Sequence, residues 1–172
     1  MPEKYVKANG IDLAYDEFGE SDHPVMLLIM GLGTQMIAWP EEFCLGLASQ
    51  GYRVIRFDNR DIGLSQKMDG KRVPHMLRMA ACARLNIPFE VPYLLEDMAR
   101  DTIGLMDALD IQSAHIVGAS MGGMIAQLVA GHFPFRVLSL TSIMSTSGRR
   151  SLPGADRKIA LHMIRRPSSA DA

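Results

Sequence analysis

Short apolar runs, separated by polar turns and by helical segments, are the dominant pattern of this chain. Four runs have the length of a strand and stop at a glycine or at polar residues: 25–30, 53–57, 114–117 and 137–144. Continuous apolar runs of this length are typical of strands that are covered on both faces in a parallel sheet. The pattern therefore predicts four buried strands.

The first residues follow a different pattern, in which apolar and polar positions alternate. Ile11, Leu13 and Tyr15 are separated by single residues, and Asn9-Gly10 stands between them and the run 5–8. Asn-Gly is a favoured two-residue hairpin turn, because both residues tolerate a positive φ. We therefore expect an N-terminal hairpin, which brings the predicted strands to six.

Helical spacing of apolar residues separates the predicted strands. In the segment 93–109, apolar residues recur at intervals of three and four. Further helices are expected at 40–49, at 76–85, after Ser120 up to Pro134, and at 155–166. Strands that alternate with helices predict an α/β fold with a mostly parallel, doubly wound sheet, since right-handed crossovers place helices on both faces.

One turn in this pattern points to chemistry. The run 114–117 ends at Gly118, Ser120 follows, and Gly122 precedes a helical pattern, which gives Gly-x-Ser-x-Gly between a strand and a helix. This setting is typical of a nucleophile elbow, where serine projects from a sharp turn and the glycines let the backbone approach closely. The N–H groups that begin the next helix would stabilise negative charge on a substrate oxygen. Ser120 is therefore the candidate nucleophile, and Gly118 and Gly122 shape the elbow.

The composition narrows the classes of function. The chain has 172 residues, of which 48% are hydrophobic and 22% charged, as in a globular domain with one core. A net charge of −1 argues against a nucleic acid or an anionic membrane as partner. We expect a cytoplasmic protein, because no apolar run could span a bilayer or form a signal core. No metal or other cofactor is expected, because the His and Cys residues lack ligand spacing.

Three stretches together resemble a known superfamily: Leu27-Leu28-Ile29-Met30-Gly31, Asp58-Asn59-Arg60-Asp61-Ile62-Gly63-Leu64-Ser65 and Val117-Gly118-Ala119-Ser120-Met121-Gly122-Gly123. In order and spacing they are similar to the N-terminal part of an α/β-hydrolase. Within that superfamily the chain most resembles small esterases related to aclacinomycin methylesterase and to cofactor-free haloperoxidases. The resemblance implies a truncated α/β-hydrolase core at 1–148, with about six of eight strands, and the start of a cap with the C-terminal helix at 149–172.

The resemblance assigns roles residue by residue. Ser120 matches the nucleophile, and the backbone N–H groups of Met121 and Leu32 match the two donors of the oxyanion hole. Met30-Gly31 stands where the family often has His-Gly, a departure that leaves a backbone donor intact. Asp58 and Arg60 match a turn that is mainly structural in the family.

The catalytic acid and the general base have no matching position. In the family they follow the seventh and eighth strands, whereas this sequence has six predicted strands. Serine needs a base, since its hydroxyl is almost never ionised near neutral pH. The candidate bases are His75 and His162, which lie near the expected cap; the remaining histidines are expected in the sheet or far from the elbow: His23, His115 and His132.

The leading hypothesis is a serine hydrolase that cleaves small carboxylic esters through a Ser120 acyl-enzyme, with reduced activity. The expected apolar lining of the substrate pocket is Met30, Met36, Trp39 and Met144. Two alternatives stay open: an inactive or weakly active remnant that binds small apolar ligands, and a haloperoxidase-like perhydrolase that uses the same residues.

The predicted strand 137–144 also bears on partners. Without a seventh and an eighth strand it would form an apolar edge of the sheet, and such an edge favours pairing with another chain. We therefore expect a homodimer through this edge or through the C-terminal helix.

Overall fold

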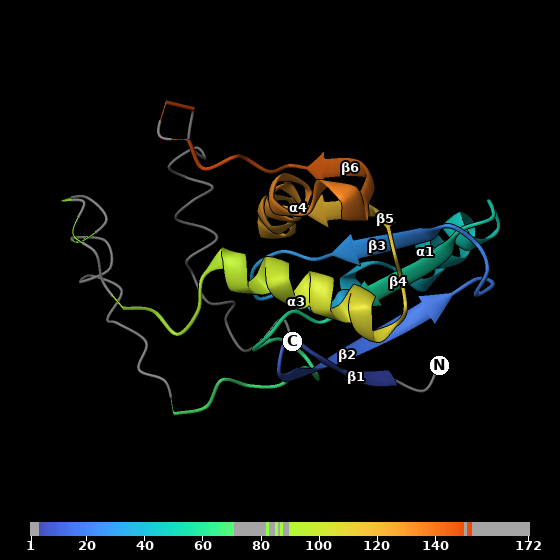
Figure 1. Ribbon diagram of the computed structural model, residues 1–172, viewed down its shortest axis with the longest axis horizontal. Coiled ribbons are helices and arrows are strands. Elements are labelled where there is room, and N and C mark those ends of the chain that lie inside the picture. The colour runs from blue at the N-terminus through green and yellow to red at the C-terminus, as the bar shows by residue number, and fades with distance from the viewer. Residues whose placement is uncertain are drawn as a thin grey trace, which may run out of the picture.

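Six strands form one sheet in the computed structural model, which describes residues 4–70, 82, 85, 87, 90–149 and 151–152. The strands are β1 (Lys4–Ala8), β2 (Ile11–Phe18), β3 (Val25–Ile29), β4 (Arg53–Phe57), β5 (Ala114–Ala119) and β6 (Val137–Ile143). They lie in the order β1-β2-β4-β3-β5-β6 (Figure 1). The pairs β1–β2 and β2–β4 are antiparallel and the other pairs are parallel. The predicted α/β fold with a mostly parallel sheet is confirmed.

The N-terminal hairpin turns at Asn9-Gly10, as predicted. Ala8 pairs with Ile11 across the turn. Asn9 has a φ of 48° and Gly10 a φ of 82°, the left-handed conformations that a tight hairpin turn requires. The turn chemistry of two residues therefore fixes the register of β1 on β2.

In the part of the chain that the structure describes, the strands are connected by α1 (Glu41–Ala48), α3 (Leu95–Ala108) and α4 (Met121–His132). Short 3₁₀ turns lie at η1 (Met36–Ala38) and η2 (Pro134–Arg136). The helix α3 begins two residues later than predicted, where the Asp97 carboxylate accepts the Leu94 N–H at 2.8 Å. Among the described helices, none has the length and apolar content needed to cross a bilayer. The expected helix at 155–166 and nearly all of 76–85 lie outside the described residues, and the described part of the chain does not test the division into parts at residue 149.

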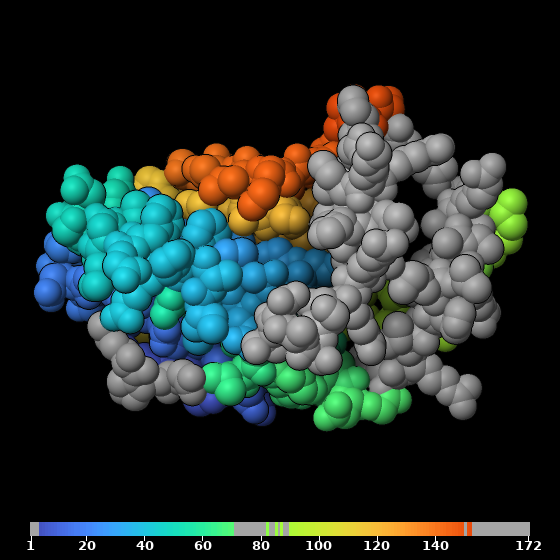
Figure 2. Space-filling model, turned by 180° about the vertical axis from the view of Figure 1, so that it is seen from behind, coloured from blue at the N-terminus to red at the C-terminus, as the bar shows by residue number. Residues whose placement is uncertain are grey.

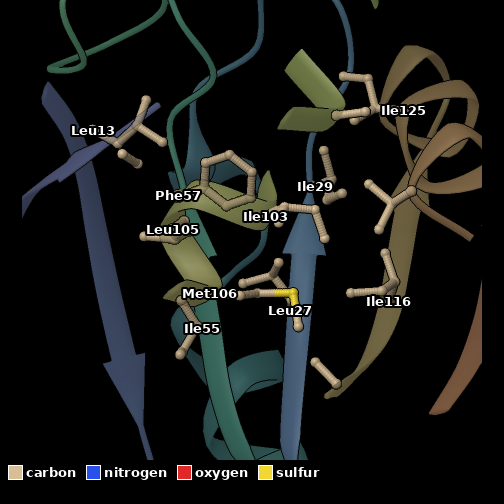
Figure 3. Close-up of a cluster of buried hydrophobic side chains, with 14 of the residues drawn as sticks. Leu13, Leu27, Ile29, Ile55, Phe57, Ile103, Leu105, Met106, Ile116 and Ile125 are labelled. Carbon is tan, nitrogen blue, oxygen red and sulfur yellow. The ribbon is translucent and has the colours of Figure 1, made fainter. Parts of the chain in front are cut away.

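The sheet has helices on both faces, and alternate residues of the strands face them. Leu27, Ile55 and Ile116 pack with side chains of α3 and α4 in the larger core (Figure 3). Leu28 and Val54 point the other way and pack with residues on and near α1. Because both faces are covered, β3 is apolar throughout and β5 is largely apolar.

The strand β6 lies at the edge of the sheet, so the expectation that it would be buried is wrong, and the expectation of an apolar edge holds. Val137 is half-buried and the rest of β6 is exposed. Leu138 is 54% exposed and Leu140 is 40% exposed. In Figure 2 the orange atoms of β6 lie open along the upper edge, whereas α1 covers another part of the same face. No strand formed by the described residues lies beyond β6 in the sheet, so one side of β6 is unpaired among them.

The register brings three chain segments to one rim of the sheet. Ile29 pairs with Phe57 of β4 and with Gly118 of β5, so the three strands end at nearly the same level. The loop after β3, the turn after β4 and the elbow after β5 therefore emerge together. In Figure 1 the arrowheads of β3 and β6 point to the side of the molecule where α3 begins. This rim holds the candidate site.

Candidate active site

Ser120 sits in the sharp turn between β5 and α4. Its φ of 55° and ψ of −120° are unusual for a residue with a side chain. Such a backbone conformation costs on the order of 1–3 kcal/mol and persists only where the surroundings enforce it. Here the Ser120 N–H donates to the Ile143 carbonyl at 2.9 Å, which ties the elbow to the end of β6. Ser120 itself is partly exposed.

Two glycines allow this turn to pack against its neighbours. A Cβ on Gly118 would lie 2.2 Å from the Gly122 carbonyl oxygen. A Cβ on Gly122 would lie 2.2 Å from the Ile29 carbonyl oxygen, so α4 begins in direct contact with the end of β3. No other residue type fits at either position without moving backbone atoms.

The loop after β3 passes beside the elbow. An ideal Cβ on Gly31 would lie 3.1 Å from the Ser120 Cβ and 3.5 Å from its Oγ. The next residue, Leu32, and the first residue of α4, Met121, line one cavity of about 260 Å³. The structure thus brings together the serine and the two segments that carry the predicted oxyanion donors, although nearly ninety residues separate them in sequence.

The cavity is mainly apolar and continues onto the start of α3. Its lining comes from the loop after β3, the turn after β4 and the two helix starts: Leu32, Gly33, Arg60, Ile62, Tyr93, Leu94, Leu95, Met98 and Met121. Leu94 and Leu95 also line a second cavity of about 520 Å³, which extends along α4 toward Thr146 and Ser147. An apolar ligand group of moderate size therefore has room beside the elbow.

A buried ion pair closes one side of the first cavity. The Arg60 Nε and Nη2 atoms donate to the two Asp101 carboxylate oxygens at 2.6 and 2.5 Å. Asn9 donates a further hydrogen bond to Asp101 at 2.8 Å. The guanidinium carbon lies 5.1 Å from the centre of the Tyr93 ring. Since its charge is balanced by Asp101, Arg60 borders the cavity without offering an unpaired cation.

Tyr93 stays protonated in this environment. Burial and a hydrogen bond to Asp61 raise the pKa of Tyr93 to about 12. Burial, the largest influence on Arg60, would lower its pKa, but the contacts with Asp101 and with other nearby groups raise it overall. At neutral pH this wall of the cavity therefore consists of a neutral phenol and a compensated cation.

Comparison with known proteins identifies the family. A model of the α/β hydrolase fold matches residues 24–161. The chain belongs to the α/β hydrolase fold family. This result confirms the resemblance inferred from the elbow and from the two motifs that precede it.

Three proteins show how this α/β hydrolase relates to others. It is 32% identical over 145 residues to rhodomycin D methylesterase DauP of Streptomyces sp. strain C5, and the match covers 84% of this chain and 42% of the relative. It is 33% identical to the putative non-heme bromoperoxidase BpoC of Mycobacterium tuberculosis, with 81% and 44% covered. A meta-cleavage product hydrolase from Pseudomonas fluorescens superposes with a TM-score of 0.64 at 26% identity, with 83% and 44% covered. The chain spans somewhat over two fifths of the length of these curated relatives.

The residues expected to line the substrate pocket are scattered in the structure. Met36 and Trp39 are buried, with 2% and 8% of their surface exposed, and Trp39 and Met30 pack in the core beneath α1. Met144, at the end of β6, is 80% exposed. The cavity beside Leu32 and Met121 is formed by other residues, chiefly from the turn after β4 and the start of α3.

The three histidines in the described part of the chain lie outside the elbow. His115 Nδ1 lies 2.8 Å from the Ser139 hydroxyl on the neighbouring strand. His132 is the last residue of α4, eleven positions and roughly 17 Å along the helix from its start. His23 lies in the turn before β3. Among the described residues the Ser120 hydroxyl has no hydrogen bond to a histidine, and the candidate bases His75 and His162 lie outside them.

In the ranges that the structure describes, no three His, Cys, Asp or Glu side chains gather closely enough to hold an ion. The candidate site there consists of a hydroxyl, backbone N–H groups and an apolar cavity.

Sequence reasoning missed the contribution of α3 to the site. Helical spacing predicted a helix at 93–109, but it gave no sign that the start of α3 lines the same cavity as Leu32 and Met121. That proximity depends on the packing of α3 against α4, which a periodic pattern does not specify. The Arg60–Asp101 pair was missed for the same reason.

Proposed function

We propose that this α/β hydrolase cleaves small carboxylic esters and that Ser120 forms the acyl-enzyme. The observation that carries the proposal is the left-handed backbone of Ser120 beside the loop of Leu32 and the start of α4. A conformation of this cost is retained where it serves a purpose, and here it places Ser120 next to Met121, which lines an apolar cavity together with Leu32. The relationship to a rhodomycin methylesterase supports an ester as the substrate.

The proposed reaction follows from this geometry. The Ser120 Oγ attacks the acyl carbon, its proton passes to a base, and the carbonyl oxygen becomes an oxyanion. The N–H groups of Leu32 and Met121 donate to that oxyanion, which favours the transition state over the ground state. Collapse of the intermediate expels the alcohol with the proton from the base. Water then attacks the acyl-enzyme by the same route and releases the acid.

The cavity favours a neutral, apolar group on the substrate. Its lining is dominated by Leu, Ile and Met side chains, and its volume of about 260 Å³ accommodates a short or branched group. An anionic tail would lose its hydration there without gaining an unpaired cation, because Arg60 is bound to Asp101. We therefore propose uncharged esters with an apolar acyl or alkyl group.

We propose that the general base is one of the two histidines named from the sequence, His75 or His162. Without a base the serine retains weak activity, since oxyanion stabilisation and substrate binding still contribute about 10³-fold over water. Replacing each histidine with alanine tests this directly. The general base is the histidine whose replacement lowers kcat toward this residual activity and removes the rise of kcat around neutral pH.

The decisive experiment is hydrolysis of p-nitrophenyl acetate and butyrate by wild type and by Ser120→Ala. We expect kcat/KM to fall at least about 100-fold in Ser120→Ala. Ser145→Ala is the matched control, because Ser145 packs against Gly123 near the elbow and its buried hydroxyl has no hydrogen-bond partner among the described residues. A fluorophosphonate probe should label wild type and Ser145→Ala and leave Ser120→Ala unlabelled. Equal hydrolysis rates in all three proteins would refute the proposal.

We also propose that two copies of the chain associate through β6. The strand has a free edge, and the exposed side chains Leu138, Leu140 and Ile143 lie along it. An uncovered apolar edge favours pairing with another strand, and two identical edges can pair about a two-fold axis.

A further inference from the structure

The loop that carries Leu32 has little of its own to hold it in place. Leu32 is 74% exposed, so its side chain does not anchor the loop in the core. Within the loop, Thr34 donates its hydroxyl to the Leu32 carbonyl at 3.1 Å and its N–H to the Gly31 carbonyl at 3.4 Å. Two local bonds of this kind do not fix the loop relative to Ser120, so its position depends on contacts at its two ends.

Asn59 holds the first end. Its side-chain amide donates to the Met30 carbonyl at 2.9 Å, directly before Gly31 and Leu32. Asn59 is only 2% exposed, which keeps water from competing for this bond. The Met30 carbonyl also faces the start of α4, because a Cβ on Gly122 would lie 2.8 Å from its oxygen. The carbonyl is therefore enclosed between the Asn59 amide and the helix that follows Ser120.

Asp58 holds the second end. Its Oδ1 accepts the Met36 N–H at 2.7 Å, where the loop passes into η1. Its Oδ2 accepts the Leu64 N–H at 2.9 Å, and its own carbonyl accepts the Ser65 hydroxyl at 2.6 Å. A Cβ on Gly63 would lie 1.9 Å from Oδ2, so the turn after β4 closes tightly around this buried carboxylate. Asp58 is thus a fixed acceptor for the loop.

We propose that Asp58 and Asn59 are positioning residues that clamp the loop 30–36 and thereby set the place of the Leu32 N–H relative to the Ser120 hydroxyl. The inference rests on the proposed ester hydrolysis and extends it to two adjacent residues that touch no substrate. They follow β4 directly, and β4 pairs with β3, so the sheet itself fixes the clamp. A donor must lie within hydrogen-bond distance of the developing oxyanion, and a shift of about 1 Å can cost roughly 100-fold in rate.

The test compares two substitutions at Asn59 with a control. Asn59→Asp keeps the size of the side chain and removes the donor, and Asn59→Ala removes the donor without adding charge. Thr102→Val is the control for the loss of one buried hydrogen bond, since the fully buried Thr102 hydroxyl donates to the Met98 carbonyl, a bond within α3 that does not include the loop. Each protein is measured by amide hydrogen exchange and by steady-state hydrolysis of p-nitrophenyl butyrate.

We expect the Thr34 and Met36 amides to exchange at least about 10-fold faster in both Asn59 variants, while the amides of β5 keep their wild-type rates. We expect kcat to fall about 10- to 100-fold with KM within about threefold of wild type, since the clamp acts on the transition state. Thr102→Val should lower the melting temperature and leave both readouts unchanged.

The clamp would be overturned if the Thr34 and Met36 amides exchange at the wild-type rate in both Asn59 variants. It would also be overturned if these amides exchange faster while kcat is unchanged, provided that hydrolysis by the wild type depends on Ser120. A wild type without Ser120-dependent hydrolysis would instead contradict the proposed function. The exchange rates then still decide whether Asn59 holds the loop.

Discussion

The close approach of α4 to β3 makes Gly122→Ala the most informative single substitution. A Cβ at position 122 would lie 2.2 Å from the Ile29 carbonyl oxygen, 2.7 Å from the Ile29 carbonyl carbon and 2.8 Å from the Met30 carbonyl oxygen. All three are backbone atoms of a central strand and its extension, so they cannot rotate away. Ordinary contact begins near 3.4 Å. The start of α4 must therefore move by roughly 1 Å, the difference between 3.4 and 2.2 Å.

That movement has two expected consequences. Overpacking against backbone typically costs about 1–3 kcal/mol in the free energy of unfolding. The proposed catalytic groups directly before Gly122, the Ser120 hydroxyl and the Met121 N–H, move with the helix start. A misplacement of about 1 Å can lower kcat about 100-fold. We expect a folded protein whose loss of activity is larger than its loss of stability explains.

The same helix supplies the control. A Cβ on Gly131, near the end of α4, meets nothing within 4 Å. Gly131→Ala should raise the free energy of unfolding by about 0.5–1 kcal/mol, because alanine favours a helix, and leave kcat unchanged. Urea unfolding and p-nitrophenyl butyrate hydrolysis measure both effects. If Gly122→Ala keeps wild-type kcat and stability, the contact between α4 and β3 does not set the geometry of the elbow.

Three further predictions concern charge and assembly. Asp101→Ala leaves the buried Arg60 guanidinium unpaired, so we expect the free energy of unfolding, measured by urea unfolding, to fall by about 3–5 kcal/mol. A loss under about 1 kcal/mol would contradict the description of Arg60 and Asp101 as a buried ion pair. Burial, the largest influence, raises the pKa of Glu17, but the contacts with Arg53 and with Lys4 lower it overall. The ionised Glu17 side chain therefore stabilises the fold above pH 4.5, and this stabilisation is lost as the pH falls further. Glu17→Gln should therefore be less stable than wild type at pH 7, with a gap in melting temperature that narrows below pH 4.5; a constant gap would exclude this linkage. Leu140→Lys should convert a wild-type dimer to a monomer in size-exclusion chromatography with light scattering, and a wild type that is already monomeric at micromolar concentration would refute the dimer.

Much of the sheet was predictable because its strands follow local rules. The Asn9-Gly10 turn and the alternation after it define the hairpin, and the residues of β4 match the predicted run 53–57. Buried parallel strands leave long apolar runs in the sequence, and Gly-x-Ser-x-Gly at the end of such a run indicates a strand, a turn and a helix. In each case the residues that determine the structure are neighbours in the sequence.

The pocket was less predictable because it depends on contacts between distant segments. Met36 and Trp39 were expected to line it on the basis of apolar character alone, which does not distinguish a core position from a cavity wall. The Met36 backbone is held by Asp58, twenty-two residues later, and this bond fixes the residue in the interior. Tyr93 borders the cavity because α3 packs beside α4, a relation between two helices that no local pattern contains.

The two proposed oxyanion donors at this rim are main-chain N–H groups. Substrate selectivity and reaction rate can therefore depend on different parts of the same two residues, which would not be so if side chains were the donors. The spacing between the Leu32 and Met121 N–H groups depends on the contact of Gly122 with β3 and on the proposed clamp by Asp58 and Asn59, whereas Leu32 and Met121 themselves line the cavity. Replacement of either side chain would alter which esters fit and leave the electrostatic environment of the reacting carbonyl in place. Selectivity and rate are thus open to independent adjustment at a single pair of positions.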